Sequence, residues 1–422
     1  MLLVKQKTKL SKTSLLNIVG NFTYFISLWL MLMLVVRILD FQSAGIFSIA
    51  ITLGNLFSIV SIYGLRLFQV SDINKEYSDQ QYMLARLITI PAGFVFCAVY
   101  VVISGYGNLQ SIIIVLFMIY KSLESFSDLC YAYYQNHGNN FNYICTSLCI
   151  KGIIQLGVFY FGLIIFEDLR YAIGLASASI LIIIISYDLP RIINIIRTAP
   201  LLTTINWKSA IKLLVKCSPM VIVLLSTPIL QAIPRIYFES QFSAELFGIF
   251  SAVSAPTMIF VVFISSALVP FIPMFSEYYN RNDHKGLMRL LLLTTGLTLA
   301  LGILSLIAAL FLGEWVLVIL YGDDIRPWSW VLYSIIIATV LTSLLSCFIS
   351  LFTAVRKLIS LAIVMLIGCV ICYIFTPYMV DTFEMDGIAF AMITGQTVII
   401  LLFTIQFLWL IHRMRKPHMT QL

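Results

Sequence analysis

Long apolar runs recur from one end of this chain to the other, and they limit its fold more than any other feature. We count twelve, each close to the roughly 20 residues that a helix needs to cross a bilayer. Backbone polar groups inside lipid must be satisfied within the segment, so runs of this length predict helices. The predicted segments are 14–39, 44–64, 84–104, 109–134, 142–166, 170–188, 209–233, 245–274, 287–312, 328–352, 358–378 and 387–411.

The scarcity of charge supports the same conclusion. The chain is 61% hydrophobic and 11% charged, whereas ordinary soluble proteins are about 25% charged. So few charges cannot cover a folded aqueous surface, and the alternating pattern of an outer-membrane barrel is absent. Four lysines before the first run resemble the start of a signal peptide, but that run is too long for one. We therefore predict an all-α, multi-pass membrane protein that retains its first helix.

The distribution of Lys and Arg predicts how the chain is oriented. Most of its 26 basic residues lie near the two termini and in the loops after the second, sixth, eighth and tenth segments. Basic loops remain cytoplasmic, so both termini are expected in the cytoplasm. Reporter fusions after Asn282 and Leu422 should then report cytoplasm, and fusions after Asp168 and Asp324 should report the opposite side.

A repeated tetrapeptide suggests an internal duplication. The sequence GIFS occurs at 45–48 and again at 248–251, and each copy follows an apolar run that closes with Arg-Ile, at Arg37 and Arg235. Six helices return the chain to the same side, so two six-helix halves would have the same orientation, as in transporters built from parallel repeats. We predict lobes at 1–198 and 199–422, with a linker at 190–208.

Charged residues inside two segments indicate a functional interior. Lys121, Glu124 and Asp128 share one face of a helix because of their spacing, and Lys151 of the next segment reaches a similar depth. A charge at the bilayer centre costs at least about 2.5 kcal/mol, so pairing or a wet cavity is expected. Lys121 with Glu124, and Lys151 with either acid, could merely hold helices together. Alternatively, the lysines line a cationic cavity, with Glu124 and Asp128 as ion-coupling groups.

Further polar residues lie on helix faces that could line such a cavity. A stripe in the first segment suits hydroxyl-rich ligands or helix packing about equally, and prolines in the seventh segment would let it flex. Arg37 and Arg235 are expected near the outer surface, as interfacial anchors or ligand contacts. The candidate substrate-binding residues are Lys121, Lys151, Lys216, Asn17, Asn21, Tyr24, Gln155, Gln231, Arg37 and Arg235.

The cysteines and the loops carry no sign of catalysis. Cys369 and Cys372, like Cys145 and Cys149, lie inside apolar runs, where small packing residues are expected rather than redox or metal sites. No Walker A sequence is present, and no loop is long enough for an extramembrane active site. We therefore expect no enzyme activity, metal or cofactor, and we expect energy from a proton or sodium gradient.

One region of the chain resembles a known family. The stretch "VVRILDFQSAGIFSIA" and the following "YGLRLFQVSDINKEYSDQQYMLAR" resemble the polysaccharide-export and O-antigen (Wzx) flippases, over about the first quarter of the chain. The matching positions are Arg37, Asp40, Gly45, Arg66 and 69–72. These flippases belong to the multidrug/oligosaccharidyl-lipid/polysaccharide superfamily, so the resemblance implies a MATE-like fold.

The resemblance also implies a substrate and partners. It implies movement of an undecaprenyl-diphosphate-linked oligosaccharide from the cytoplasmic to the periplasmic leaflet of a bacterial inner membrane, in lipopolysaccharide biosynthesis. Membrane lipid, an O-antigen polymerase and a chain-length regulator would be partners, and nucleic acid would not. Two alternatives remain open: a MATE-type cation-coupled drug antiporter, and a major-facilitator-like solute transporter.

Overall fold

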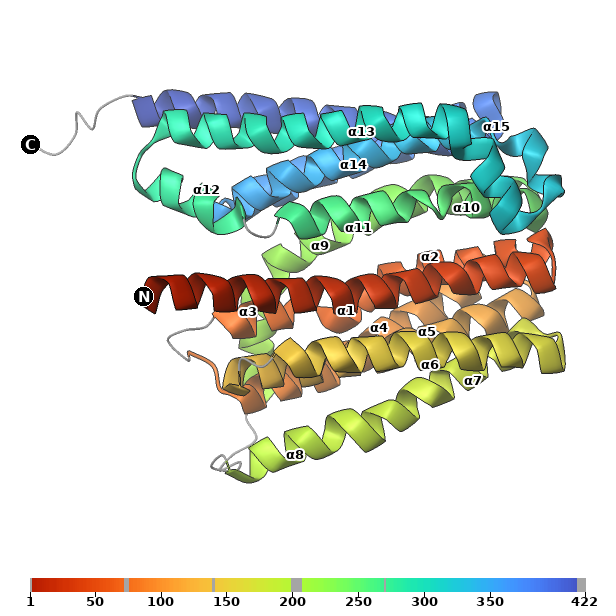
Figure 1. Cartoon of the computed structure of the whole chain (residues 1–422), viewed down its shortest axis with the longest axis horizontal. Helices are drawn as coiled ribbons and strands as arrows, with labels where there is room; N and C mark the ends of the chain where they lie inside the picture. Colours follow the sequence, from red (N-terminus) through yellow and green to blue (C-terminus); the bar gives the residue numbers. More distant parts are fainter. Residues whose placement is uncertain (1, 72–75, 139–140, 199–206, 269–270, 416–422) are drawn as a thin grey trace, which may run out of the picture. The chain divides into compact units, whose positions relative to one another are not determined.

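The computed structural model describes residues 2–71, 76–138, 141–198, 207–268 and 271–415, and gives only the backbone for 2–18 and for a few residues beside the gaps. The described residues are helical between short connections, as predicted (Figure 1). Two compact units are distinguished, Met1–Leu225 and Ser226–Leu422. The boundary between them falls inside α9 (Trp207–Gln241), beyond the linker that the sequence suggested.

The first unit begins with a long helix and ends in the first half of α9. Its other elements are α1 (Leu2–Ile38), α2 (Phe41–Ile62), α3 (Leu65–Ser71), α4 (Asp79–Ser104), α5 (Asn108–Gly138), α6 (Phe141–Phe166), α7 (Leu169–Ile183), a π-helix (Ile184–Asp188) and α8 (Leu189–Thr198).

Small residues and aromatic rings set the packing of this unit. A Cβ added to Gly20 of α1 would lie 2.9 Å from the Cα of Cys145 in α6, so these two backbones approach as closely as small residues allow in membrane helices. The ring of Phe47 in α2 meets Phe117 of α5 edge-on at 5.6 Å and stacks on Phe159 of α6 at 5.7 Å. Cys145 is thus a packing residue, as expected.

The end of α7 departs from the prediction. The sequence suggested that the sixth segment ends at 188 and that a loop begins at Pro190. Instead the helix widens into the π-helix Ile184–Asp188 and continues as α8. Pro190 lies in the first turn of α8, where its missing N–H breaks no hydrogen bond within that helix. The consequence is that Asp188 lies inside a membrane span, Leu169–Ile193, and not at its end.

The second unit begins in the second half of α9. Its other elements are α10 (Ala244–Ser254), α11 (Thr257–Leu268), α12 (Phe271–Asn280), α13 (His284–Tyr321), a 3₁₀-helix (Asp323–Trp328), α14 (Val331–Ala354) and α15 (Leu358–Arg415). α9 stays one continuous helix despite its prolines. The span predicted at 287–312 extends further, because α13 continues to Tyr321.

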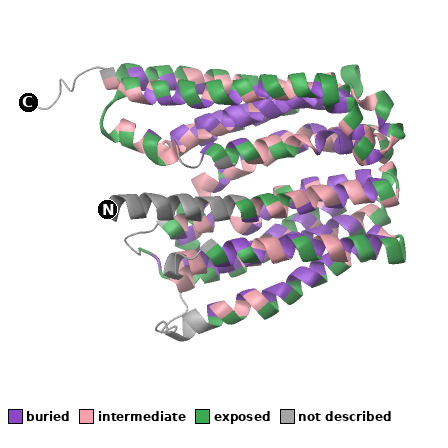
Figure 2. Cartoon of the chain, in the orientation of Figure 1, coloured by how far each residue is buried: buried purple, intermediate pink, exposed green. Residues whose placement is uncertain are grey.

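Burial differs sharply between two helices of this unit. In α14, 72% of the apolar window is buried inside the protein, against 17% in α13. Figure 2 shows α14 mostly buried, whereas exposed residues recur along α13. α14 is therefore the core helix of the unit, and α13 presents its apolar side chains to lipid.

The last helix is a hairpin of two arms. Glu384 has a non-helical backbone (φ 48°, ψ −119°), which breaks α15. The hydroxyl of Ser360 donates to Gln406 at 2.8 Å, and a Cβ on Gly368 would lie 2.1 Å from the Ile399 side chain. Residues so far apart in sequence can meet only if the arms fold back on each other.

The candidate spans of the structure correspond to the predicted segments. Among the described residues, ten helices are long and apolar enough to cross a membrane, and α10 with α11, bent by 48° at their junction, forms an eleventh candidate. Counting the two arms of α15 separately accounts for all twelve predicted segments. The sequence missed the bend inside the predicted segment 245–274, since hydropathy alone does not register a helix break.

The two GIFS copies occupy matching places in their helices. Asp40 caps α2 by accepting from the Ser43 N–H at 2.6 Å, and Ser243 caps α10 by accepting from the Leu246 N–H at 3.3 Å. Each cap lies five residues before the glycine of its copy, and all residues of the second copy and all but Ile46 of the first are buried. This correspondence supports the predicted duplication.

Candidate functional site

The first charged cluster of unit 1 joins α5 to α1. Lys121 Nζ lies 2.7 Å from Glu124 Oε2, one turn further along α5. The Tyr24 hydroxyl of α1 donates to Glu124, and its oxygen lies 2.8 Å from the Tyr120 hydroxyl oxygen. The ammonium also lies over the rings of Phe117 and Tyr120, at 5.6 and 5.7 Å. The Glu124 side chain remains 20% exposed and that of Lys121 only 8%. The carboxylate is thus the more accessible partner.

A chain of hydrogen bonds extends this cluster to α6. The Tyr120 hydroxyl donates to Gln155 Oε1 at 2.8 Å, and the Gln155 amide donates to the Ser27 hydroxyl at 2.6 Å. Gln155 and Ser27 are both buried. Gln155, Tyr24 and Ser27 therefore connect α1, α5 and α6. The sequence left two roles open for the polar stripe of the first segment, ligand binding and helix packing, and these contacts favour helix packing.

The second cluster surrounds Lys151 of α6. Its ammonium donates to the Ser127 hydroxyl at 2.8 Å, to the Tyr131 hydroxyl at 3.0 Å and to Asp188. An ammonium has three N–H donors, so all of them are used. The carboxylate of Asp188 accepts in addition from the Tyr143 hydroxyl at 2.7 Å and from a serine of α6.

This pair corrects the expected partner of Lys151. The sequence suggested that Lys151 pairs with Glu124 or Asp128, but its partner is Asp188, at the end of the π-helix. The side chains of the pair are 3% and 0% exposed. Such a saturated, enclosed pair is suited to holding α6 against the π-helix, and Lys151 has no donor left for another ligand.

The third cluster surrounds Asp128. Arg66 of α3 donates to one carboxylate oxygen at 3.0 Å, and Arg86 of α4 donates to the other. Arg66 also donates to Gln135 Oε1 at 3.1 and 3.2 Å. Gln135 lies seven residues after Asp128, on the same face of α5. The side chain of Arg86 is 1% exposed and that of Arg66 is 25% exposed. One carboxylate therefore holds two cations, and the cluster keeps a net positive charge.

The predicted segments placed Arg66 in the cytoplasmic loop after residue 64 and Arg86 at the cytoplasmic start of the segment 84–104. Instead, Arg86 lies about two turns inside α4, because that helix begins at Asp79 rather than at 84. Arg66 lies in the apolar span Phe41–Val70. Asp128 is thus already neutralised, which leaves Glu124 as the less constrained of the two predicted ion-coupling groups.

The remaining predicted residues of unit 1 lie elsewhere. Lys216 of α9 pairs with Glu76 at 2.5 Å, and the two side chains are 45% and 58% exposed. The structure therefore does not group Lys216 with Lys121 and Lys151. Arg37 is exposed at the end of α1, and Asn21 is half-buried. The side chain of Asn17 lies outside the described residues.

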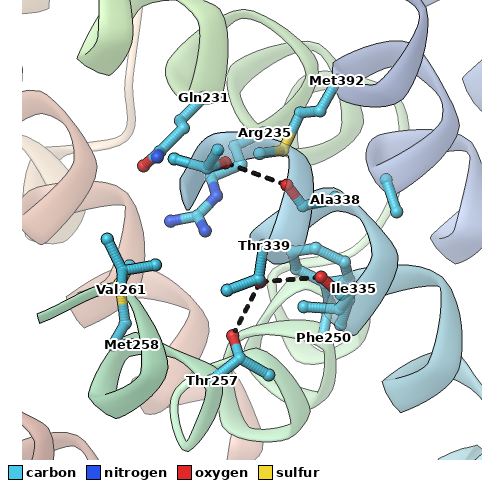
Figure 3. A pocket seen from close by; sticks show the side chains of 12 residues that line it. Gln231, Arg235, Phe250, Thr257, Met258, Val261, Ile335, Ala338, Thr339 and Met392 are labelled. Carbon is cyan, nitrogen blue, oxygen red and sulfur yellow. Dashed lines mark hydrogen bonds between the residues drawn. The ribbon is translucent and has the colours of Figure 1, made fainter. Parts of the chain in front are cut away.

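Unit 2 contains one of the predicted arginines in a small cavity. Arg235 and Gln231 of α9 point toward a space bordered by threonines of α11 and α14 (Figure 3). The Thr339 hydroxyl donates to the Ile335 carbonyl of its own helix at 2.7 Å, and its oxygen lies 3.3 Å from the Thr257 hydroxyl oxygen. The cavity of about 30 Å³ has room for one or two waters. Arg235 Nε is buried without a hydrogen-bond partner among the described residues, so this N–H of the guanidinium can donate to a further polar ligand there.

The residue that sequence reasoning missed is Asp188. Its segment ends in "SYDLP", and a proline two residues after an acidic residue suggested a loop there. The signal that could have identified it is the amphipathic stretch that follows, "LPRIINIIRT", because apolar residues continue there at helical spacing.

The fold defines the class of protein: it is a multi-pass α-helical membrane protein with the fold of MATE-like transporters. The chain is similar to the Vibrio cholerae MATE transporter VcmN (TM-score 0.65, 11% identity, 97% of both chains). It is similar to the lipid II flippase MurJ in an inward closed conformation (TM-score 0.69, 16% identity, 95% of this chain and 90% of the other). A MOP-superfamily transporter from Pyrococcus furiosus described as having a binding pocket of reverse polarity gives a TM-score of 0.65 at 12% identity, over 96% of both chains.

Sequence comparison adds one curated relative. The chain is 25% identical over 310 residues to the capsular polysaccharide biosynthesis protein CapF of Staphylococcus aureus, covering 72% of this chain and 76% of CapF. No protein-family model matches. The sequence resemblance to polysaccharide-export proteins thus agrees with this relative, and the MATE-like fold expected from it is confirmed.

Proposed function

We propose that this protein is a flippase that moves an undecaprenyl-diphosphate-linked oligosaccharide, such as an O-antigen repeat unit, from the cytoplasmic to the periplasmic leaflet by alternating access. The observation that carries the proposal is an excess of positive charge inside apolar helices. The three clusters of unit 1 contain the cations Arg66, Arg86, Lys121 and Lys151 and the carboxylates Glu124, Asp128 and Asp188.

The groups suited to contact a diphosphate are those that remain accessible. Arg66 keeps 25% of its side chain exposed, and its planar guanidinium matches phosphate oxygens. Lys121 is less accessible, with 8% of its side chain exposed, and would contact a phosphate oxygen by exchanging Glu124, its partner in the ion pair, for that oxygen. Lys151 has no free donor, so we assign it to the support of these helices. The polyprenyl chain would stay in lipid, and the glycan would meet the tyrosine and amide groups of α1 and α5.

Glu124 is the group best placed to couple transport to an ion gradient. It is partly exposed, and its partners are one lysine and one tyrosine hydroxyl. When a diphosphate captures Lys121, the carboxylate loses its counter-charge and can take up a proton or sodium ion. Asp128 would keep two arginines throughout. Glu124→Gln should therefore weaken gradient dependence more than Asp128→Asn.

The alternative is a MATE-type drug antiporter, which the shared fold favours. Such a transporter binds organic cations and needs unpaired acidic groups. Here each carboxylate of the three clusters is already bound to at least one cation. A MATE-like fold also argues against the major-facilitator alternative, since both arrange twelve helices but connect and pack them differently.

A reconstituted transport assay distinguishes these functions. The full-length protein in proteoliposomes would be given a fluorescent undecaprenyl-diphosphate oligosaccharide, and protection of the glycan from an external sugar-modifying enzyme would be followed under an imposed pH gradient. Lys121→Met should lower the rate of protection at least tenfold, because the loss of one charged contact is worth about 1.5–3 kcal/mol. The control is Lys216→Met, which removes an exposed lysine from the same unit and should leave the rate within about twofold.

Two results would contradict the proposal. Wild-type vesicles that exchange protons for a fluorescent cationic drug, while leaving the glycan lipid unmoved, would establish the antiporter instead. Equal rates for wild type and Lys121→Met would show that this lysine does not contact the transported lipid.

A further inference from the structure

A basic hollow lies in unit 2, between the first turns of α13 and the end of α15, which run side by side in Figure 1. It is an open depression with a volume of about 340 Å³, within the range of about 300–1,000 Å³ that is usual for small-ligand sites. Its lining residues are His284, Lys285, Met288, Arg289, Leu292 and Ile411.

The positive charge of this hollow is not neutralised within the described part of the chain. Lys285 and Arg289 form no ion pair there. The nearby carboxylate of Asp283 accepts from the Gly286 N–H at 2.9 Å and caps α13. Glu277 is paired with Arg281 at 2.7 Å. Two cations facing one hollow favour an anionic ligand.

An aromatic residue places the hollow at the level of lipid headgroups. Trp409 of α15 is 57% exposed and lies two residues before Ile411. Lys357 Nζ and Arg413 Cζ both lie over its ring, at 5.3 and 5.6 Å from the centroid. Exposed tryptophan beside basic side chains is typical of the membrane–water interface, so the hollow lies where phosphate groups are concentrated.

An apolar face continues from the hollow toward the middle of the bilayer. Leu292 is 63% exposed, Leu299 46% and Ile303 59%. Their spacings of seven and four residues place them on one side of α13. This face can accommodate an acyl chain, so charge and apolar surface are arranged in the order in which a phospholipid carries its headgroup and its tail.

We propose that this hollow binds the headgroup of an anionic phospholipid. Lys285 and Arg289 hold the phosphodiester, and one acyl chain lies along the exposed face of α13. The bound lipid fixes the peripheral helix α13 against the end of α15. This site is separate from the charged clusters of unit 1, and the inference does not depend on which substrate is transported.

Native mass spectrometry of the full-length protein, released from detergent micelles, tests the proposal. Phosphatidylglycerol and the zwitterionic phosphatidylcholine, with matched acyl chains, would be titrated separately. Wild type should bind phosphatidylglycerol more tightly, and Lys285→Gln/Arg289→Gln should weaken that binding about 30-fold. The figure follows from about 1 kcal/mol for each basic residue near anionic lipid and a tenfold change for every 1.4 kcal/mol.

A matched double variant supplies the control. Arg281→Gln/Arg326→Gln removes two exposed cations of the same unit that do not line the hollow, and its affinity should stay within about threefold of wild type. Equal losses in both double variants would show a general charge effect and overturn the site. Tight binding of undecaprenyl phosphate that phosphatidylglycerol does not displace would also overturn it, because the hollow would then receive the isoprenoid lipid.

Discussion

The buried pair of Lys151 and Asp188 allows the most direct test of how this protein is held together. In Lys151→Met, the Asp188 carboxylate stays in the interior, 0% exposed, with two hydroxyl donors but no cation. Removing one partner of a buried pair costs about 3–5 kcal/mol, mostly because the other charge is left uncompensated. Asp188→Asn should cost a similar amount, since it strands the lysine.

The double variant Lys151→Met/Asp188→Asn removes both charges at once. The amide oxygen that replaces a carboxylate oxygen can still accept from Tyr143 and Ser147, and methionine fills much of the volume of lysine. We expect the double variant to be more stable than either single variant, with a coupling energy of at least about 2 kcal/mol. The measurement is unfolding of the purified protein in mixed micelles as the fraction of denaturing detergent increases.

The matched control is the exposed pair of Lys216 and Glu76, with side chains 45% and 58% exposed. Its double-mutant cycle should give less than about 1 kcal/mol, because water screens such pairs. Equal coupling energies for the two pairs would refute the reasoning. Transport by the stable double variant separates two roles: activity near that of wild type means that Lys151 supports the helices, and lost activity means that it contacts the substrate.

Two further predictions concern the hairpin and one connection. Gly387→Ala should prevent folding of α15, because the new Cβ would lie 2.3 Å from the Met379 carbonyl oxygen. The control is Gly296→Ala in α13, where the new Cβ has nothing within 4 Å and should lower neither the yield nor the melting temperature. Similar melting temperatures for both variants would contradict the close approach at Gly387. Hydrogen bonding from Arg170 lowers the pKa of Asp168. The resulting stabilisation is fully present above the pKa that Asp168 has in the unfolded chain, and it is lost as the pH falls through the lower pKa of the folded protein. Arg170→Gln should therefore make the protein unfold at a higher pH during acid titration. An unchanged midpoint of acid unfolding would contradict this.

Much of the architecture follows from the sequence by itself. The length of each apolar run is a local property, because every helix in lipid must satisfy its own backbone. The shared face of Lys121, Glu124 and Asp128 is equally local, since it depends only on helical spacing. For this reason the helices and the polar face of α5 were predicted in nearly the right places.

The partners of these charges were decided only by the tertiary structure. Lys151 meets Asp188 because α6 packs on α7 and the π-helix turns the carboxylate inward, and neither contact is encoded by spacing within one helix. Asp128 meets Arg86 because α4 begins earlier than its hydropathy suggests and carries the arginine into the interior. Ion pairs depend on which helix faces meet, so the sequence determined that charges lie inside the membrane, and packing determined which of them remain accessible to a ligand.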